Sequence, residues 1–163
     1  MIRKVNFKDT SQIREIYNYY ILNSIVNFEE KPVSMDKMKE IINDISSKFL
    51  WIVYEENEKI LGYAYASVWK ARSGYLHTAE TSIYLKQGES KKGIGTKLYT
   101  ELINQLKKLN YHALIGGIAI PNNASIVLHK KLGFKKVAHF KEVGFKFNKW
   151  LDVEYWELRI NEN

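Results

Sequence analysis

The chain has 163 residues, 45% of them hydrophobic and 26% charged, a profile that predicts one globular domain spanning residues 1–163 with a core of its own. It contains no cysteine, which excludes disulfides, thiolate metal sites and a cysteine nucleophile. A formal net charge of +7 predicts attraction to anions, without choosing among nucleic acid, an acidic surface and a phosphorylated cofactor.

No apolar run approaches the roughly 20 residues that a membrane span needs, and the start "MIRKVNFKDT" lacks the apolar stretch of a secretory signal. We therefore expect a cytoplasmic protein with no membrane partner. The histidines are scattered and form no H-E-x-x-H or H-x-H arrangement, so we expect no metal site. They are His77, His112, His129 and His139.

The first half of the chain predicts two helices followed by a hairpin. "DTSQIREIYNYYILNS" predicts a helix with Asp9 as its N-cap, and "SMDKMKEIINDISSK" predicts a second helix capped by Ser34. Between them, "IVNFEEKP" reads as a short extended piece ended by Pro32. "FLWIVYEE" and "KILGYAYASVWK" are rich in β-branched and aromatic residues and flank the polar turn "ENE", which predicts a β-hairpin.

The second half alternates strands and helices before two closing strands. "YLHTAETSIYLK" predicts a third strand, and residues 94–109 predict a helix with leucines along one face. "HALIGGIAI" predicts a buried strand, and "NNASIVLHKKLG" a short helix stopped by Gly133. "FKKVAHFKEV" and "LDVEYWELRI" predict the closing strands. The order ααβββαβαββ predicts an α/β (α+β) fold with one mixed sheet covered by helices.

The segment "SKKGIGTKLYTEL" follows the third predicted strand and opens the next helix. It is not a P-loop, because Ile94 stands where the lysine belongs, and not a dinucleotide fingerprint, because Leu98 replaces the third glycine. Gly93 and Gly95 leave backbone N–H groups uncovered at the positive end of a helix, which favours an anion such as a pyrophosphate. Two glycines alone would fit a surface turn better.

The pattern does not stand alone. "SKKGIGTKLYTEL" resembles the Q/R-x-x-G-x-G/A segment of the GNAT acyltransferases, with Ser90 where glutamine or arginine is usual, and "NNASIVLHKKLGF" resembles the closing helix and strand of that superfamily. "VNFEEKP", "WKARSGY", "ETSIYL", "PNNASIVLHKKLGF" and "GFKFNKWLDV" together look like the phosphinothricin and methionine-sulfoximine acetyltransferase group. The resemblance covers nearly the whole chain. It implies a GNAT fold, with a single mixed, mostly antiparallel sheet flanked by helices.

The resemblance implies acetyl-CoA as the cosubstrate, with no metal. Its pyrophosphate would lie in the glycine loop, and its pantetheine arm would pair with the strand before that loop like an added strand. Asn122 would contact the cofactor, although the residue alone also fits a helix N-cap. The implied cofactor residues are Ile83, Tyr84, Leu85, Lys91, Lys92, Gly93, Ile94, Gly95, Thr96, Asn122 and Lys131.

Two residues are candidates for the chemistry. A partly desolvated Glu80 beside the cofactor would have a raised pKa and could accept the proton of the attacking amine, but a solvent-exposed or lysine-paired glutamate fits the residue alone equally well. The match of "ETSIYL" to the group's catalytic-glutamate segment favours the base. His129 stands where many GNAT enzymes have a tyrosine acting as the acid toward the thiolate, and we leave its role open between acid and second base.

The resemblance also implies an acceptor site. A guanidinium in "WKARSGY" would grip a carboxylate or phosphinate, and "VNF" would line the side-chain pocket. The implied substrate residues are Asn27, Phe28, Lys70, Arg72 and Tyr75. Lys146, Trp150 and Asp152 match the group's late motif, with Trp150 equally able to be core, dimer contact or substrate wall.

Together these features predict an acetyl-CoA-dependent N-acetyltransferase of the EC 2.3.1 class acting on the α-amine of a small amino acid or analogue. Phosphinothricin and methionine sulfoximine are the acceptors that the resemblance nominates, a role in antibiotic or herbicide resistance is what the group suggests, and a homodimer is what the family implies. One alternative keeps the fold and changes the acceptor to a protein N-terminus, polyamine or aminoglycoside. A basic nucleic-acid-binding domain is a further alternative, but no recognition-helix or RNP-like signature supports nucleic acid as a partner.

Overall fold

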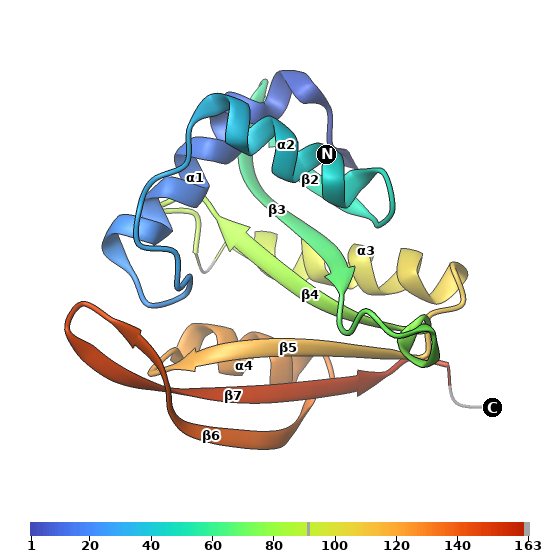
Figure 1. Ribbon diagram of the computed structural model, residues 1–163. Coiled ribbons are helices and arrows are strands. Elements are labelled where there is room, and N and C mark those ends of the chain that lie inside the picture. The colour runs from blue at the N-terminus through green and yellow to red at the C-terminus, as the bar shows by residue number, and fades with distance from the viewer. Residues whose placement is uncertain (91, 162–163) are drawn as a thin grey trace.

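The structure is a computed structural model that describes residues 1–90 and 92–161. Within this range a seven-stranded sheet has the order β1-β2-β3-β4-β5-β7-β6 (Figure 1). The strands are β1 (Ile2–Lys4), β2 (Trp51–Glu56), β3 (Lys59–Val68), β4 (Thr78–Leu85), β5 (Ala113–Ile120), β6 (Lys135–Lys146) and β7 (Lys149–Arg159). The helices are α1 (Thr10–Asn23), α2 (Met35–Ser46), α3 (Ile94–Lys108) and α4 (Asn123–Lys131), with short 3-10 turns η1 (Phe7–Asp9) and η2 (Ser73–Tyr75).

The sheet divides at the junction of β4 and β5. Every other neighbouring pair of strands is antiparallel, whereas β4 and β5 run parallel and pair only where Thr78–Glu80 meets Ala113–Ile115. Beyond that point the two strands spread apart, which Figure 1 shows as a wedge. The predicted mixed, mostly antiparallel sheet is therefore confirmed, and its one parallel contact leaves backbone groups of both strands facing a gap.

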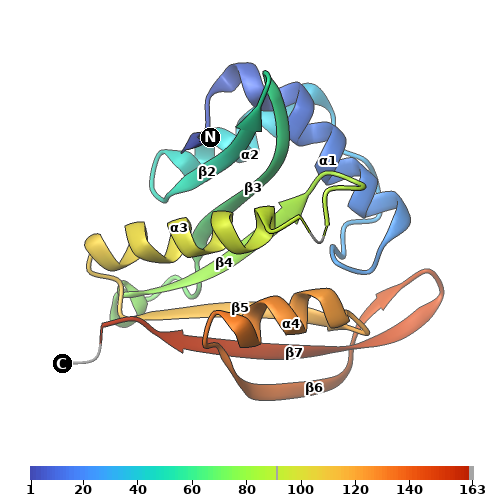
Figure 2. The ribbon, with the colours of Figure 1, turned by 180° about the vertical axis from the view of Figure 1, so that it is seen from behind.

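Helices cover both faces of the sheet, as predicted. α1 and α2 pack on one face of β2, β3 and β4, around a core of Ile13, Met38, Trp51, Val53 and Tyr63. α3 and α4 lie on the other face (Figure 2), where Leu98, Leu102 and Leu106 of α3 pack against the strands. Because successive side chains on a strand point to opposite faces, each strand contributes to both layers.

Local signals explain most element ends. The Ser34 side chain accepts a hydrogen bond from the backbone N–H of Lys37 and caps α2 as predicted, and Gly133, with φ of +88°, follows the end of α4. Asp9 is the N-cap residue of α1, as predicted, but its side chain makes no capping hydrogen bond. Its carboxylate instead accepts two hydrogen bonds from the Arg3 guanidinium, at 2.7 and 2.8 Å, which ties the first strand to α1.

Two further expectations need correction. The short strand β1 was not anticipated, because three residues are too few to establish an alternating pattern. The extended piece predicted over residues 25–32 pairs with no strand and forms a loop between α1 and α2. Among the described residues, no helix has the length and apolarity that a membrane crossing requires, and no cluster of three or more His, Asp or Glu side chains could hold a metal ion.

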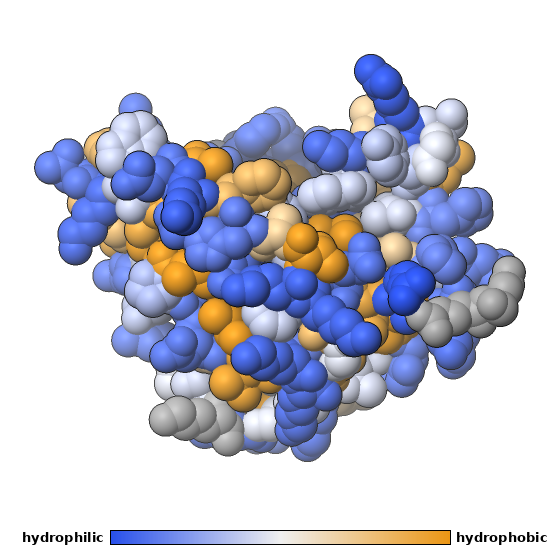
Figure 3. Space-filling view, turned by 90° about the horizontal axis from the view of Figure 1, so that it is seen from below, coloured by the Kyte–Doolittle hydropathy of each residue, from blue (hydrophilic) through white to orange (hydrophobic). Residues whose placement is uncertain are grey.

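The closing strands form a long, irregular hairpin. The pairing of β6 with β7 shifts register in two places. At the hairpin turn, β6 continues to Lys146 and β7 begins at Lys149, so both strands extend further toward the turn than the sequence predicted. Large apolar side chains stay exposed on this hairpin, and the view from below shows hydrophobic patches between polar ones (Figure 3). They are Val137, Phe140, Val143, Phe145, Phe147 and Trp150.

Candidate active site

Glu80 lies at the point where the wedge begins. It is the last residue of β4 that pairs with β5, opposite Ile115, while Ser67 of β3 is its partner on the other side. Its carboxylate is partly buried and makes no hydrogen bond to any described residue. Burial raises the pKa of Glu80, and the positive charge of Lys70 opposes that rise. A carboxylate with unused acceptor capacity and a raised pKa is suited to receiving a proton.

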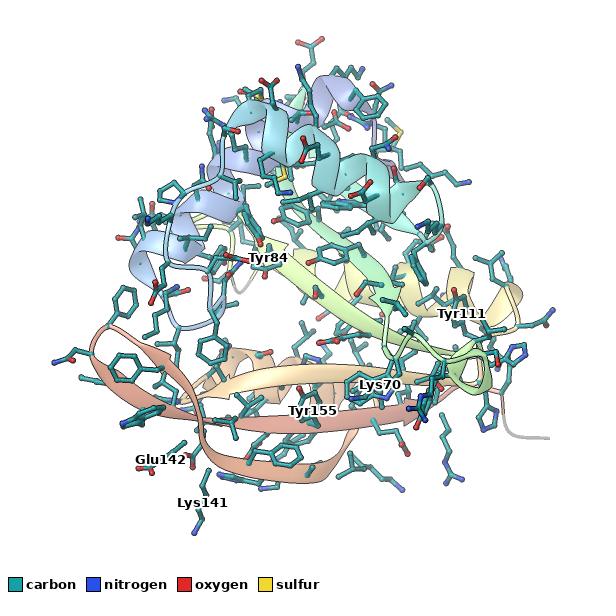
Figure 4. All side chains as sticks on the ribbon, viewed as in Figure 1. Lys70, Tyr84, Tyr111, Lys141, Glu142 and Tyr155 are labelled. Atoms are coloured by element: carbon teal, nitrogen blue, oxygen red, sulfur yellow. The ribbon has the colours of Figure 1, made fainter. Side chains whose placement is uncertain are left out.

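A glycine on β5 makes room for this carboxylate. A Cβ built on Gly117 would lie 3.6 Å from Oε1 of Glu80 and 3.4 Å from Cε1 of Tyr155 on β7. Trp69 packs edge-on against the same tyrosine, with ring centroids 5.4 Å apart. Figure 4 labels Lys70 and Tyr155, both of which lie near enough to interact electrostatically with Glu80. Sequence reasoning missed Trp69 and Tyr155, since only strand pairing brings β7 beside β5.

His129 lies on the opposite face of the sheet from Glu80. Its side chain is 4% exposed and packs against Tyr99 of α3 and Phe134. A Cβ on Gly116 would come within 2.5 Å of its Nε2, so the neighbouring glycine of β5 makes room for the ring. Burial lowers the pKa of His129. The two predicted catalytic side chains therefore approach adjacent residues of one strand from opposite sides and do not contact each other.

The glycine loop leads into α3 with its backbone donors exposed. Gly93, at φ of +78°, is the N-cap residue in a left-handed conformation, and no side chain caps this end of the helix. Amides in the first turn of a helix have no partner inside it, so those of Ile94, Gly95 and Thr96 are available to an anion. Lys92 lies beside them, paired with Glu89 at 3.0 Å. The predicted contact at Lys91 lies outside the described residues.

The end of β4 lies close to this loop. Past Glu80, the strand is paired with β3 alone, which leaves its other edge open along Ile83, Tyr84 and Leu85. The side chain of Ile83 packs against the α3 core and that of Tyr84 lies in the α1–α2 core. The Leu85 carbonyl accepts a hydrogen bond from the hydroxyl of Tyr20 at 2.8 Å.

Helix α4 lies beside the start of α3. Leu128 would lie 3.6 Å from a Cβ on Gly95, so α4 packs against the start of α3. Asn122 is the N-cap of α4, where its side chain accepts a hydrogen bond from the N–H of Ser125 at 3.1 Å. Lys131 is exposed in the last turn of α4, where a positive charge interacts favourably with the negative end of the helix dipole.

The predicted substrate residues form two separate groups. Lys70, Arg72 and Tyr75 are exposed in the loop around η2, near the closed end of the wedge, and the Arg72 guanidinium has no hydrogen-bond partner among the described residues. Asn27 and Phe28 lie in the α1–α2 loop, toward its open end (Figure 1). The structure thus does not bring all five residues together.

A lysine fastens the α1–α2 loop to the closing hairpin. Nζ of Lys146, 4% exposed, donates hydrogen bonds to the carbonyl oxygens of Ser24, at 2.8 Å, and Asn27. The Phe28 ring lies directly over Gly144 of β6. This contact spans the wedge between the two halves of the molecule, a role that the sequence did not indicate.

The other two residues of the late motif, Trp150 and Asp152, lie away from Glu80. Trp150 is 64% exposed, and its ring lies against that of Phe145, with ring centroids 4.8 Å apart. Asp152 lies on the α4 face of β7, where its carboxylate accepts a hydrogen bond from His139 at 2.7 Å. Neither residue lies beside Glu80.

Comparison with known proteins agrees with this geometry. Residues 2–155 match the family described as the acetyltransferase (GNAT) domain. The chain is 32% identical to an L-methionine sulfoximine/L-methionine sulfone acetyltransferase of Salmonella typhimurium, covering 99% of this chain and 95% of the relative. It is 33% identical to an L-amino acid N-acyltransferase of Escherichia coli, covering 99% and 94%. A phosphinothricin N-acetyltransferase of Streptomyces viridochromogenes is 30% identical, covering 96% and 85%.

Solved structures give the same picture. An acetyltransferase from Salmonella typhimurium, solved with its cofactor acetyl-CoA, has a TM-score of 0.96 and 32% identity over 100% of this chain and 95% of that one. A phosphinothricin acetyltransferase from Sinorhizobium meliloti in complex with acetyl-CoA has a TM-score of 0.94 and 33% identity over 98% and 87%. The predicted fold and enzyme class are confirmed, and both related structures hold the predicted cosubstrate. The chain belongs to the GNAT acetyltransferase family.

Proposed function

We propose that this enzyme transfers the acetyl group of acetyl-CoA to the α-amine of a small amino acid or analogue, with methionine sulfoximine and phosphinothricin as the leading acceptors. The observation that carries the proposal is the Glu80 carboxylate, which is partly buried at the point where β4 and β5 part and has no hydrogen-bond partner in the part of the chain that the structure describes. The names of the relatives from Salmonella, Escherichia and Streptomyces support the acceptor class.

Direct attack of the amine on the thioester is the mechanism that fits these residues. The protonated amine first gives a proton to Glu80, whose raised pKa makes its carboxylate a better acceptor than an exposed glutamate. The neutral nitrogen then forms a bond to the acetyl carbonyl carbon. As the tetrahedral intermediate collapses, the C–S bond breaks, and the second proton of the attacking nitrogen passes to the leaving thiolate, which gives the amide and free CoA. The leaving thiolate is the conjugate base of a thiol whose pKa is about 8.5, so its departure needs only mild assistance. The absence of cysteine from the chain is consistent with a route that has no thioester intermediate on the enzyme.

The cofactor would be aimed by its phosphate end. The uncapped first turn of α3 presents amides and the positive end of a fifteen-residue helix to the pyrophosphate, and Lys92 adds a positive charge. The pantetheine arm would then follow the open edge of β4 from Leu85 toward Glu80 and bring the thioester into the wedge. Acetyl-CoA supplies the acetyl group, and the protein supplies orientation and the base.

The acceptor would be held by its acidic group. Lys70 and Arg72 lie in the loop that precedes β4, and Lys70 is close enough to lower the pKa of Glu80. A guanidinium without a protein partner suits a carboxylate, sulfoximine or phosphinate oxygen. These cations would repel polyamines and aminoglycosides, so we favour amino acids over those acceptors.

We further propose that the chain acts as one domain in the cytoplasm and as a homodimer. The exposed apolar side chains of the β6–β7 hairpin, such as Phe145, Phe147 and Trp150, are the surface we assign to the second copy.

A thiol-release assay tests the proposal. Purified protein with acetyl-CoA should liberate free CoA on addition of L-methionine sulfoximine, and mass spectrometry should find the product acetylated on the α-nitrogen. The N-acetylated acceptor, which lacks a free amine, is the matched control and should give no release. Release with spermidine or an aminoglycoside and none with a panel of amino acids and analogues would replace the acceptor class.

A further inference from the structure

Opposite Glu80, the sheet holds a row of buried polar side chains from three elements. Thr81 follows Glu80 on β4 and is the first residue beyond the pairing with β5, Tyr99 comes from α3, and His129 comes from α4. Their exposed fractions are 5%, 0% and 4%. Buried polar groups cost free energy unless they are hydrogen-bonded, so the partners of each atom determine what this row does.

The Tyr99 hydroxyl lies at the centre of the row. Its oxygen is 2.6 Å from Oγ1 of Thr81 and 3.1 Å from Nε2 of His129. On the far side of the imidazole, Nδ1 lies 2.8 Å from the carbonyl oxygen of Ser125, one turn earlier in α4. The Thr81 hydroxyl has a second acceptor within reach, the carbonyl oxygen of Ile115 at 3.3 Å.

The Ser125 hydroxyl oxygen also lies 3.4 Å from Nδ1, and one assignment of the hydrogens gives both imidazole nitrogens a partner. The Ser125 carbonyl only accepts, so Nδ1 of His129 must carry a hydrogen. Burial lowers the pKa of His129, so the ring is neutral at neutral pH and its Nε2 is a bare acceptor. Burial also raises the pKa of Tyr99, which therefore keeps its hydrogen and donates it to Nε2.

Packing prevents the ring from turning over. The Tyr99 and Phe134 rings contact the imidazole edge-on, at centroid distances of 5.2 and 4.9 Å. Backbone of Gly116 closes the remaining side, where a Cβ would come within 2.5 Å of Nε2. Shape and hydrogen bonds thus select the same orientation.

We propose that Tyr99 is a positioning residue: its hydroxyl holds His129 as the neutral Nδ1–H tautomer, with Nε2 directed at the point where β4 and β5 part. This inference rests on the proposed function for its kinetic consequence, but not for the tautomer itself. It resolves the open choice for His129, because a ring held in this way is not an imidazolium acid at neutral pH. His129 then contributes to acetyl transfer as a fixed, neutral group.

The charged surroundings do not disturb this state. Tyr99 on α3 is in direct contact with the ring, and Glu80, across the sheet on β4, interacts electrostatically with Tyr99. The next residue of α4, Lys130, points instead toward the Trp156 ring of β7. Among the described residues, burial and the Ser125 carbonyl are the influences on the pKa of His129.

Nitrogen NMR of the full chain labelled with ¹⁵N-histidine tests the tautomer directly. Wild-type His129, assigned by the loss of its signals in His129→Gln, should show a protonated Nδ1 and a bare Nε2 from pH 6.5 to 8. In Tyr99→Phe, which keeps the ring and loses the donor, the two nitrogens should move toward a mixture of tautomers. An Nε2–H tautomer or an imidazolium in the wild type at pH 7 would overturn the proposal without any variant.

Kinetics supply the second readout. Removing one hydrogen bond is expected to lower kcat by roughly 2- to 10-fold, while the KM for acetyl-CoA changes less than about twofold. Tyr63→Phe is the matched control, because Tyr63 is equally buried on the other face and its hydroxyl has no hydrogen-bond partner among the described residues. It should leave the His129 signals and kcat unchanged.

The two readouts separate this inference from the proposed function. If no acceptor is acetylated but Tyr99→Phe alters the His129 tautomer, the positioning role stands and the function falls. If acetylation occurs and Tyr99→Phe leaves both the tautomer and kcat unchanged, the positioning role falls and the function stands.

Discussion

The two faces of the sheet at Gly116 and Gly117 offer a direct comparison, because these neighbours on β5 each make room for one ionisable side chain. On the α1–α2 face, the Glu80 carboxylate has no hydrogen-bond partner among the described residues and lies beside Lys70. On the α3–α4 face, both imidazole nitrogens of His129 are hydrogen-bonded. Burial favours the neutral form of both groups, so it raises the pKa of Glu80 and lowers the pKa of His129.

The difference lies in what remains unsatisfied. A buried polar group that already has its partners stabilises one conformation, whereas one without partners keeps its bonding capacity for a ligand. On the α3–α4 face the fold itself supplies the partners of His129, whereas on the α1–α2 face the Glu80 carboxylate keeps its acceptor capacity for the proposed substrate. Four predictions test this contrast, ordered from the largest expected effect to the smallest.

Glu80→Gln should produce the largest change in activity. It removes the proton acceptor but keeps the shape of the side chain, so kcat/KM should fall by about 10²–10⁴-fold at pH 7.5, the usual contribution of a general base. Initial rates of CoA release measure this. Calorimetric binding of acetyl-CoA is the control and should be nearly unchanged, and full activity in Glu80→Gln would remove the carboxylate from the mechanism.

Gly116→Ala and Gly117→Ala should differ in stability. The new Cβ at position 116 would meet Nε2 of His129 at 2.5 Å, an overlap that costs about 1–3 kcal/mol of unfolding free energy. The nearest atom to a Cβ at position 117 is 3.4 Å away, an ordinary contact, so that variant should lose less than about 1 kcal/mol. Urea denaturation of both variants gives the comparison, and equal losses would contradict the distinction between a closed and an open face.

The difference in stability between Glu80→Gln and the wild type should change with pH in a defined direction. Because folding raises the pKa of Glu80 above its ordinary 4.5, the folded state holds this proton more tightly than the unfolded chain. The wild type thus loses stability as pH rises from about 4.5 through the raised pKa, and glutamine does not titrate. The Tm of the variant relative to the wild type should be higher at pH 7 than at pH 4. The opposite slope would mean that the carboxylate has a stabilising partner.

Lys70→Met should give the smallest of these changes in the pH profile, separate from the rise in acceptor KM expected when a cation of the proposed acceptor site is removed. The charge of Lys70 opposes the rise in the pKa of Glu80, so its removal should move the acid limb of the kcat/KM profile slightly to higher pH. The shift should be small, because Lys70 is exposed and solvent screens its charge. Added salt should move the wild-type limb in the same direction and leave that of Lys70→Met nearly fixed. A limb that moves to lower pH would show that Lys70 acts in another way.

Much of the architecture could be predicted from local patterns. The leucines of α3, the cap at Ser34 and the stop at Gly133 depend on residues within a turn or two, and such signals survive in any tertiary context. The glycine start of α3 could also be predicted, because a glycine at φ of +78° before a helix is a local feature. Asp9 is the predicted N-cap residue of α1, but its carboxylate is hydrogen-bonded to Arg3 and not to the helix, which the local pattern did not indicate.

What the sequence by itself determined is therefore most of the elements, with the short strand β1 as an exception, the family resemblance, and the candidate residues taken one at a time. Only the tertiary structure decided which side chains lie next to one another. It places Glu80 near Tyr155 on one face of the sheet and His129 against Tyr99 on the other, and it joins the α1–α2 loop to β6 through Lys146. The physical reason is that a residue's type and spacing fix its conformation locally, whereas burial and hydrogen-bond partners arise from strands and helices that meet across long stretches of chain.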